Sequence, residues 1–164
     1  MQLQPDVLTA LEAMPESFAA LYACFPAEAL RWQPKSWDGM PGETFCAADQ
    51  ACHVRDIEID GYQVRIQRVL SETKPELTSF DSYELARERN YAGQNPVEAL
   101  RQFKAGRAQT LRLIADIQGD EFERRATFGE YGEVTLAGLI YFLCSHDQQH
   151  LACMHWLLGK WHSR

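Results

Sequence analysis

Hydrophobic side chains recur at steps of three and four residues in four stretches of the chain, which is the pattern of amphipathic helices. The first stretch extends from about Asp6 to Phe25, and Pro15 is expected to divide it into a short lead and a main helix. The second stretch extends from about Gly42 to Leu70, with charged residues between its apolar positions.

The third stretch starts at Asn95, a residue type that caps helices, and Pro96 follows at the first helical position. It is expected to stop at Gly119. The fourth covers about residues 134–158, and Gly159 is expected to end it. Strand signals are weak: the segment EYGEVTL is the best candidate, but it reads more naturally as a turn into the fourth helix.

Four helices of roughly 20 residues with moderate connections predict an all-α fold, an antiparallel four-helix bundle. The chain has 164 residues, a normal size for one domain, and it shows no internal repeat or low-complexity segment. The sequence therefore predicts a single domain over residues 1–164.

Composition narrows the function classes. The net charge is −7 and no stripe of Lys and Arg stands out, which disfavours nucleic-acid binding. No run approaches the roughly 18 apolar residues of a membrane helix, and the first residues lack the basic region of a secretory signal. The five cysteines form no CxxC pair, which favours reduced thiols and a cytoplasmic location.

Two histidines interrupt the apolar stripe of the fourth helix. His146 and His150 are one helical turn apart on the face that also carries Leu143, Cys153 and Leu157. Imidazoles at positions i and i+4 can reach one metal ion. The alternative is two buried neutral rings, each of which would need a hydrogen-bond partner.

His53 supplies a third candidate ligand, because it can share a face with apolar positions of the second helix. If the second and fourth helices are neighbours, His53 can face the pair formed by His146 and His150. Three imidazoles suit Zn, Ni, Fe or Cu better than Mg or Ca. Three protein ligands leave a position open for water or substrate, which is typical of catalytic sites.

Each of several other residues near these histidines has two possible roles. Cys153 could be a fourth ligand or an ordinary buried cysteine. Asp147 stands where the HExxH motif has its Glu base, so it is a candidate catalytic base or a supporting carboxylate. Asp56, one turn after His53, could orient an imidazole or contact solvent. His155 and His162 are expected not to be ligands.

These residues occur in an order that resembles the DinB-like superfamily of four-helix bundles. The matching segments are, in chain order, ALRWQP, the trio His53, Asp56 and Glu58, then KPELTSFD, RAQTLRLIADI and GEVTLAGLIYFLCSHDQQHLACM. The segment SWDGMPGETF departs from the Trp-Ser start of many relatives. The resemblance implies that His53, His146 and His150 bind one divalent metal, and it suggests a homodimer.

Two classes of function follow. The first is a metal-dependent enzyme acting on a small molecule, by thiol transfer or by hydrolysis, with Zn, Ni or Fe at the histidines and Asp56 or Asp147 assisting. Because some relatives use a low-molecular-weight thiol, the resemblance slightly favours thiol transfer over hydrolysis. The second is a non-catalytic metal-binding or stress-response bundle that acts as a dimeric binding module. A third reading has no metal, with the histidines paired to carboxylates or carbonyls.

Overall fold

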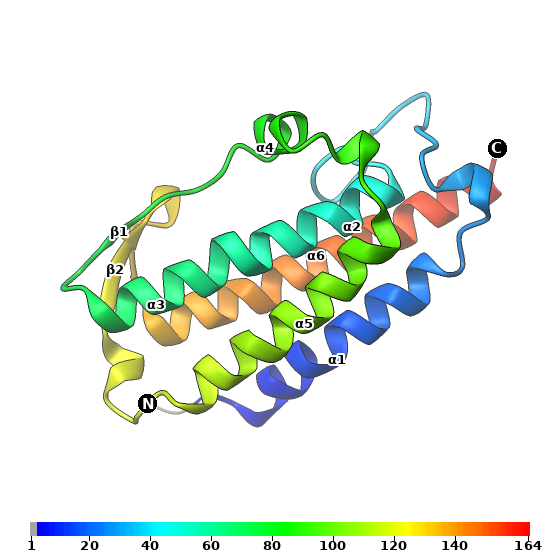
Figure 1. Ribbon diagram of the computed structural model, residues 1–164. Helices are drawn as coiled ribbons and strands as arrows, with labels where there is room; N and C mark the ends of the chain where they lie inside the picture. Colours follow the sequence, from blue (N-terminus) through cyan, green and yellow to red (C-terminus); the bar gives the residue numbers. More distant parts are fainter. Residues whose placement is uncertain (1–2) are drawn as a thin grey trace.

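Four long helical segments form a bundle, as the hydrophobic pattern predicts (Figure 1). The structure is a computed structural model and describes residues 3–164. One of the four segments is continuous from residue 47 to residue 71 but contains a π-helical stretch, named η2, in its middle. The segments are α1 (Pro5–Tyr22), α2–η2–α3 (Ala47–Asp56, Ile57–Gln63 and Val64–Ser71), α5 (Pro96–Ala115) and α6 (Leu136–His162).

The directions of the helices follow from one long connection. Residues 72–95 lead back along the outside of the bundle and contain three short elements, β1 (Glu76–Leu77), α4 (Ser82–Glu88) and η3 (Tyr91–Gly93). In consequence α5 runs in the same direction as α2–α3, whereas α1 and α6 run in the opposite direction (Figure 1). The contacting pairs α1/α5 and α2/α6 are therefore antiparallel.

Capping side chains start two of the helices where the sequence predicts. The side chain of Asn95 accepts hydrogen bonds from the backbone N–H groups of Val97 at 3.0 Å and Glu98 at 3.3 Å. The Thr135 hydroxyl accepts one from the N–H of Gly138 at 3.0 Å. Each cap satisfies donors that the first helical turn leaves free.

Some predicted boundaries are wrong. The third helix ends at Ala115, before the expected stop at Gly119, because the N–H of Ile117 bonds the Ile114 carbonyl in a tighter turn. The first helix continues through Pro15, which is buried, because packing on both sides of it outweighs the one hydrogen bond that proline removes. The last helix passes Gly159, which is exposed, and ends at His162. The second helix begins at Ala47, since Gly42 and its neighbours form an irregular loop.

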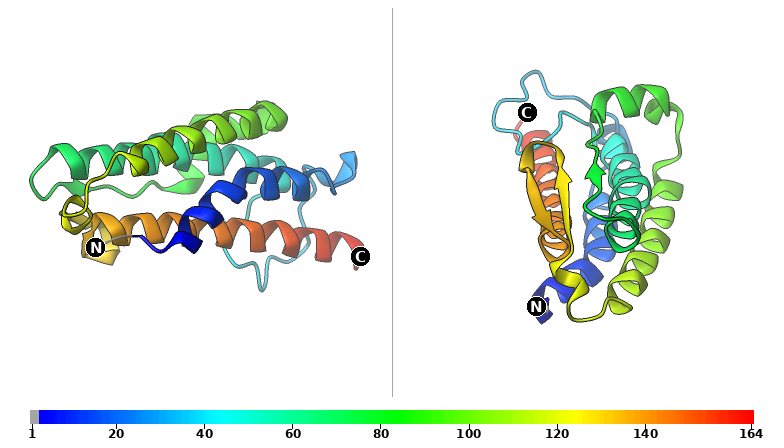
Figure 2. Two further views of the ribbon diagram at one scale, coloured as in Figure 1. Left: turned by 90° about the horizontal axis from the view of Figure 1, so that it is seen from below. Right: turned by 90° about the vertical axis from the view of Figure 1, so that its left-hand side faces the viewer.

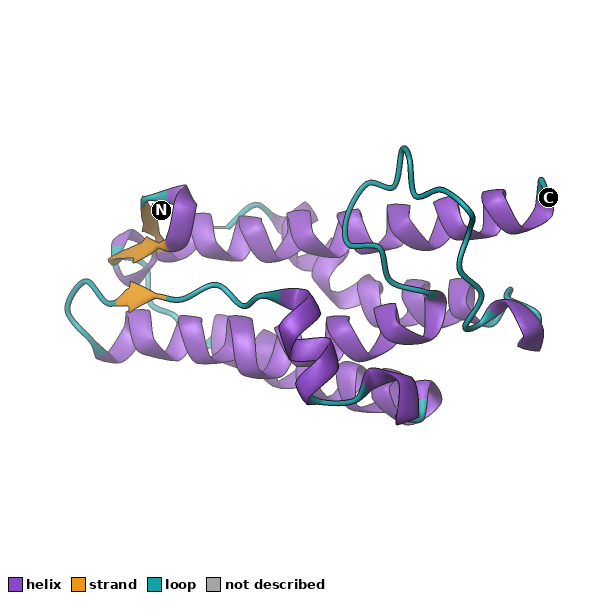
Figure 3. Cartoon of the chain, turned by 90° about the horizontal axis from the view of Figure 1, so that it is seen from above, coloured by secondary structure: helices purple, strands orange, loops and turns teal. Residues whose placement is uncertain are grey.

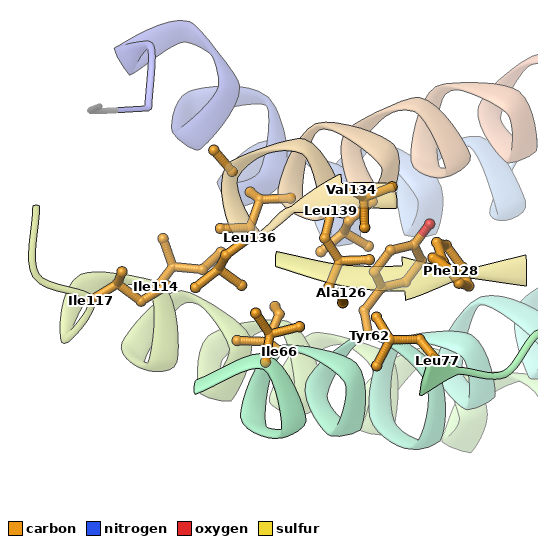
Figure 4. Packing of buried hydrophobic residues seen from close by; sticks show 14 of the residues in the cluster. Tyr62, Ile66, Leu77, Ile114, Ile117, Ala126, Phe128, Val134, Leu136 and Leu139 are labelled. Carbon is orange, nitrogen blue, oxygen red and sulfur yellow. The ribbon is translucent and has the colours of Figure 1, made fainter. Parts of the chain in front are cut away.

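A small three-stranded sheet lies at the end of the bundle where α6 begins (Figures 1 and 2). The expectation of only a turn before the fourth helix is wrong, because Gly129 and Gly132 adopt positive φ angles of 44° and 70° and turn the chain into a hairpin. Apolar side chains from the strands pack onto the bundle core (Figure 4). The strands are β1 (Glu76–Leu77), β2 (Arg125–Phe128) and β3 (Glu133–Thr135), with β1 parallel and β3 antiparallel to β2.

A buried arginine joins all four segments of the bundle. Arg107 of α5 donates from Nε and Nη2 to Glu58 of η2, at 3.0 and 2.7 Å. It donates from Nη1 and Nη2 to Asp147 of α6, at 2.7 and 3.0 Å, and from Nη1 to the Leu11 carbonyl of α1 at 2.8 Å. All five donor hydrogens of a guanidinium thus have partners, in a place from which water is excluded.

No helix formed by residues 3–164 is both long and apolar enough to cross a bilayer.

Replacing Arg107 by Met is expected to lower the free energy of unfolding by about 3–5 kcal/mol, because Glu58 and Asp147 lose their buried cationic partner. Urea unfolding of the purified variant measures this. The control is Arg101→Met, which removes an exposed ion pair with Glu98 and should cost at most about 1 kcal/mol. Equal effects of the two substitutions would contradict the role given to Arg107.

Candidate metal centre

His53 from α2 and His146 and His150 from α6 come together inside the bundle. Each offers one ring nitrogen, and these three atoms lie within 4.8 Å of one another. The Nε2 atoms of His146 and His150 are 3.0 Å apart. The ring centroid of His53 lies 4.7 Å from that of His150 and 5.5 Å from that of His146. This spacing allows one ion to contact all three rings with small side-chain adjustments.

A buried glutamine fixes the ring of His150. Its Nδ1 lies 2.6 Å from Oε1 of Gln50, and Gln50 in turn donates from Nε2 to the Glu43 carbonyl at 3.3 Å. Because Gln50 presents its oxygen, Nδ1 of His150 must carry the proton, which leaves a lone pair on Nε2. His150 therefore presents an acceptor nitrogen to the other two histidines.

His53 is 1% exposed, yet neither of its ring nitrogens has a hydrogen-bond partner among the described residues. Unsatisfied buried polar atoms are rare and costly in folded proteins. The reading in which all three histidines pair with carboxylates or carbonyls does not fit this ring. An ion contacted by His53 would satisfy one of the two nitrogens, so the donor set fits a transition metal.

Burial keeps all three imidazoles neutral. It is the largest influence on each ring and lowers the pKa of His53, His146 and His150. At His146 the neighbouring charges of His53, Arg107 and Arg65 lower the pKa further. At His53 the carboxylates of Glu43 and Asp56 act in the opposite direction. A neutral imidazole is the form that binds metal.

The loop before α2 adds a carboxylate that the hydrophobic pattern does not reveal. Oε1 of Glu43 lies 3.8 Å from Nε2 of His53, and Oε2 lies 3.8 Å from Nε2 of His150. The Ser82 hydroxyl donates to Oε1 at 3.0 Å, whereas Oε2 is buried without a partner among the described residues. One oxygen of Glu43 is thus held in place and the other faces the histidines.

Tryptophan pairs attach this loop to the last turns of α6. The rings of Trp32 and Trp161 meet edge to face at 5.4 Å, and those of Trp37 and Trp156 stack at 6.0 Å. Figure 3 shows the loop lying over this part of α6. The loop is therefore held by packing at several points, which fixes the position of Glu43.

Gly42 allows the loop to approach α6 closely. A Cβ atom at this position would lie 2.6 Å from Nε2 of Gln149 and 3.0 Å from Sγ of Cys153. Any larger residue would push the adjacent Glu43 away from the histidines or displace Gln149.

The two aspartates predicted as catalytic lie beside the histidines without hydrogen-bonding to them. Asp56 accepts hydrogen bonds from Arg55 and from the Tyr91 hydroxyl, both at 2.7 Å. Both oxygens of Asp147 accept from Arg107, and burial raises the Asp147 pKa to about 6 against the opposing effect of that guanidinium. The structure therefore brings Glu43, and not these aspartates, nearest to the ring nitrogens; their catalytic role stays a prediction.

Three further residues lie outside the histidine group. Cys153 is buried, and burial raises its thiol pKa to about 12, which opposes the thiolate form that a metal requires. Among residues 3–164, the one group of His, Cys, Asp and Glu side chains close enough to share an ion contains only the three histidines. His155 and His162 are exposed, as expected of residues that are not ligands.

A cleft of about 240 Å³ opens beside the histidines and is here called the histidine cleft. Glu43, His53 and His146 contribute to its wall, together with Arg65 and the ring of Tyr62. Further aromatic rings line it, from Phe80, Phe128 and Tyr131. A small molecule entering this cleft reaches the ring nitrogens and the Glu43 carboxylate.

Comparisons with known proteins show the family and the fold of this chain. The sequence profile of the DinB superfamily matches residues 10–154. Among solved structures, YfiT from Bacillus subtilis, described as a probable metal-dependent hydrolase with an unusual four-helix bundle topology, superposes with a TM-score of 0.80. The two chains are 16% identical, and the match covers 93% of this chain and 83% of that one, so it shows the fold. No curated protein matches the sequence.

The lowered histidine pKa values predict how the metal-free protein responds to acid. The pKa of a histidine in the unfolded chain is about 6.5. Because the folded values lie lower, the unfolded chain binds more protons on these three side chains below this pH. Asp147, whose folded pKa is raised to about 6, acts in the opposite direction, but it is one group against three, so the free energy of unfolding should fall as the pH drops from about 7.5 to 5.5. Each buried histidine contributes at most about 1.4 kcal/mol per pH unit.

Urea unfolding at several pH values measures the slope. His150→Gln should reduce the slope, whereas His155→Gln, at an exposed position of the same helix, should leave it unchanged. A wild-type stability that is flat over this pH range would contradict the neutral buried trio.

Proposed function

This chain belongs to the DinB superfamily, and from that membership and the buried histidines we propose that it is a metal-dependent hydrolase of small molecules. One observation carries the proposal above the others. Three imidazoles converge within 4.8 Å, and one of them, His53, has no hydrogen-bond partner for either nitrogen although it is buried. A structural role leaves both nitrogens of His53 unexplained, whereas a bound ion would account for one of them.

The residues that would hold the ion are His53, His146 and His150. Nitrogen ligands of this kind favour Zn, Ni or Fe. A divalent ion held by these residues would supply Lewis-acid chemistry and would lower the pKa of a bound water to about 7. Three protein ligands beside an open cleft leave room for water and substrate, as in catalytic sites and unlike closed structural ones.

Gln50 and Arg107 support the site from outside the trio. Gln50 holds the proton of His150 on Nδ1, so that Nε2 stays available as a ligand. Arg107 holds Asp147, the residue next to His146, against the core of the bundle. Both contacts fix the helix that carries two of the three ligands.

Glu43 is the proposed proton acceptor. Its Oε1 is held by Ser82, and its Oε2 faces His150 without a partner. A water molecule between this oxygen and the histidines would be within reach of both. Accepting the proton of that water at Oε2, and giving it to the leaving group, is the general acid–base work that hydrolysis requires. Asp56, which already accepts two hydrogen bonds at 2.7 Å, is less available for this role.

Metal content tests the ligand set. Untagged wild-type protein is expected to hold about one equivalent of Zn, Ni or Fe by elemental mass spectrometry, as an open three-histidine site would. His150→Ala should lose the metal. His155→Ala, a change at an exposed histidine of the same helix, should keep it. Metal that persists in a folded His150→Ala variant would contradict the assignment.

Glu43→Gln separates catalysis from metal binding. The variant should keep its metal, because the imidazoles are unchanged, but lose about 10²–10⁴-fold in kcat, the usual contribution of a general acid–base group. Turnover is measured with a panel of small esters and amides, with and without a low-molecular-weight thiol. Activity that appears only with the thiol would replace hydrolysis by thiol transfer, and unchanged kcat in the variant would exclude Glu43 as the proton acceptor.

A further inference from the structure

Arg65 is a buried cation without an anionic partner. The residue is 6% exposed, and no carboxylate between residues 3 and 164 forms an ion pair with it. Burial lowers the pKa of its guanidinium, and the side chains that oppose this effect are the two tyrosines Tyr62 and Tyr131. By contrast, the other fully buried arginine, Arg107, has two carboxylates. An uncompensated buried charge costs stability and points to an anion that completes the site.

Two of the five N–H groups of the Arg65 guanidinium are already engaged. Nε and Nη2 both donate to the carbonyl oxygen of Thr78, at 3.2 and 2.9 Å. Nη1 has no hydrogen bond to the described residues. The edge of the guanidinium formed by Nη1 and Nη2 therefore keeps unpaired N–H groups, and two parallel hydrogen bonds from this edge are the geometry that binds a carboxylate.

Aromatic rings hold this side chain in one place. Its guanidinium carbon lies 5.2 Å from the ring centre of Tyr62, 5.4 Å from that of Phe80 and 4.7 Å from that of Phe128. Gly61 provides the necessary space, because a Cβ there would lie 3.0 Å from Nη1. The rings fix the direction of the free edge and supply apolar walls around it.

Arg65 and the candidate metal centre belong to one cleft. Both Arg65 and His146 line the histidine cleft, with Tyr62 between them. The Tyr62 ring centre is 5.9 Å from that of His146, and the Arg65 guanidinium lies over the same Tyr62 ring. A small molecule can therefore contact Arg65 at one end and the histidines at the other.

We propose that Arg65 binds the carboxylate of a small monoanionic substrate and thereby places its hydrolysable bond at the three histidines. This inference rests on the proposed function, since it names the substrate class of the same site. The substrate is an organic acid with a compact apolar body and an ester or amide bond a short distance from the carboxylate.

Charge and size favour a monoanion over a phosphate ester. Arg65 is the one cationic side chain that lines the histidine cleft, and Glu43 lines the same cleft with a negative charge. A dianion would meet one cation and one repelling carboxylate. The volume of about 240 Å³ and the rings of Phe80, Phe128 and Tyr131 suit a small acid with an apolar or aromatic body.

Binding to the metal-free protein tests this inference apart from catalysis. The probes are phenylacetate and its neutral match phenylacetamide, titrated by calorimetry or NMR at pH 7.5, where the buried histidines are neutral. Phenylacetate should bind about tenfold or more tightly than phenylacetamide, as a charge-assisted bidentate contact predicts. Equal affinities, or no binding of phenylacetate, would overturn the proposal.

Two variants locate the contact. Arg65→Gln should reduce phenylacetate affinity to that of the amide. The control Arg68→Gln, on the same helix but paired with Glu72, should change neither affinity. Unchanged phenylacetate binding in Arg65→Gln would overturn the proposal. If that variant does not fold, Arg65→Lys, which keeps the charge but not the two-pronged geometry, should still lose several-fold in affinity.

These outcomes separate the two proposals. Absence of a carboxylate preference in the wild type, or its persistence in Arg65→Gln, with metal binding intact would overturn only the role of Arg65. Absence of metal in the wild type, with phenylacetate still bound at Arg65, would overturn only the hydrolase proposal.

Discussion

The contact on which the bundle depends is the buried guanidinium of Arg107. It hydrogen-bonds Glu58 of η2, Asp147 of α6 and the Leu11 carbonyl of α1, and so ties the other three segments to α5. Apolar packing alone tolerates sliding of one helix along another, but a set of paired charges has one satisfied arrangement. Its strength is offset by desolvation, so its contribution is better described as fixing register than as adding stability.

That register determines where the histidines lie. Asp147 directly follows His146, so the contact with Arg107 sets the rotation of α6 about its axis. On the other side, Glu58 stands in the π-helical stretch between His53 and Arg65. The extra residue per turn in such a stretch changes which side chains face inward beyond it, and π-helical turns often occur at functional sites. The same contact thus relates the three imidazoles to the residues of the cleft.

Helical periodicity was enough to predict the histidine trio. His146 and His150 share a face with Leu143 and Leu157, and the cap at Asn95 marks the start of α5 in the sequence itself. Glu43 could not be predicted in this way, because its place depends on tryptophan rings far along the chain that hold an irregular loop. Arg65 could not either, since its lack of a carboxylate partner appears only once the fold is known. Contacts between residues far apart in the sequence leave no local pattern in it, whereas the spacing of residues along one helix does.

The most direct test of the account is X-ray absorption spectroscopy at the metal edge of protein loaded with one equivalent of Zn. The account predicts a shell of nitrogen and oxygen scatterers at about 2.0–2.1 Å from the Zn, with the outer-shell signature of three imidazoles. A sulfur scatterer at about 2.3 Å from the Zn would instead place Cys153 in the coordination sphere. That result, or a shell without imidazole, would contradict an open site built from His53, His146 and His150.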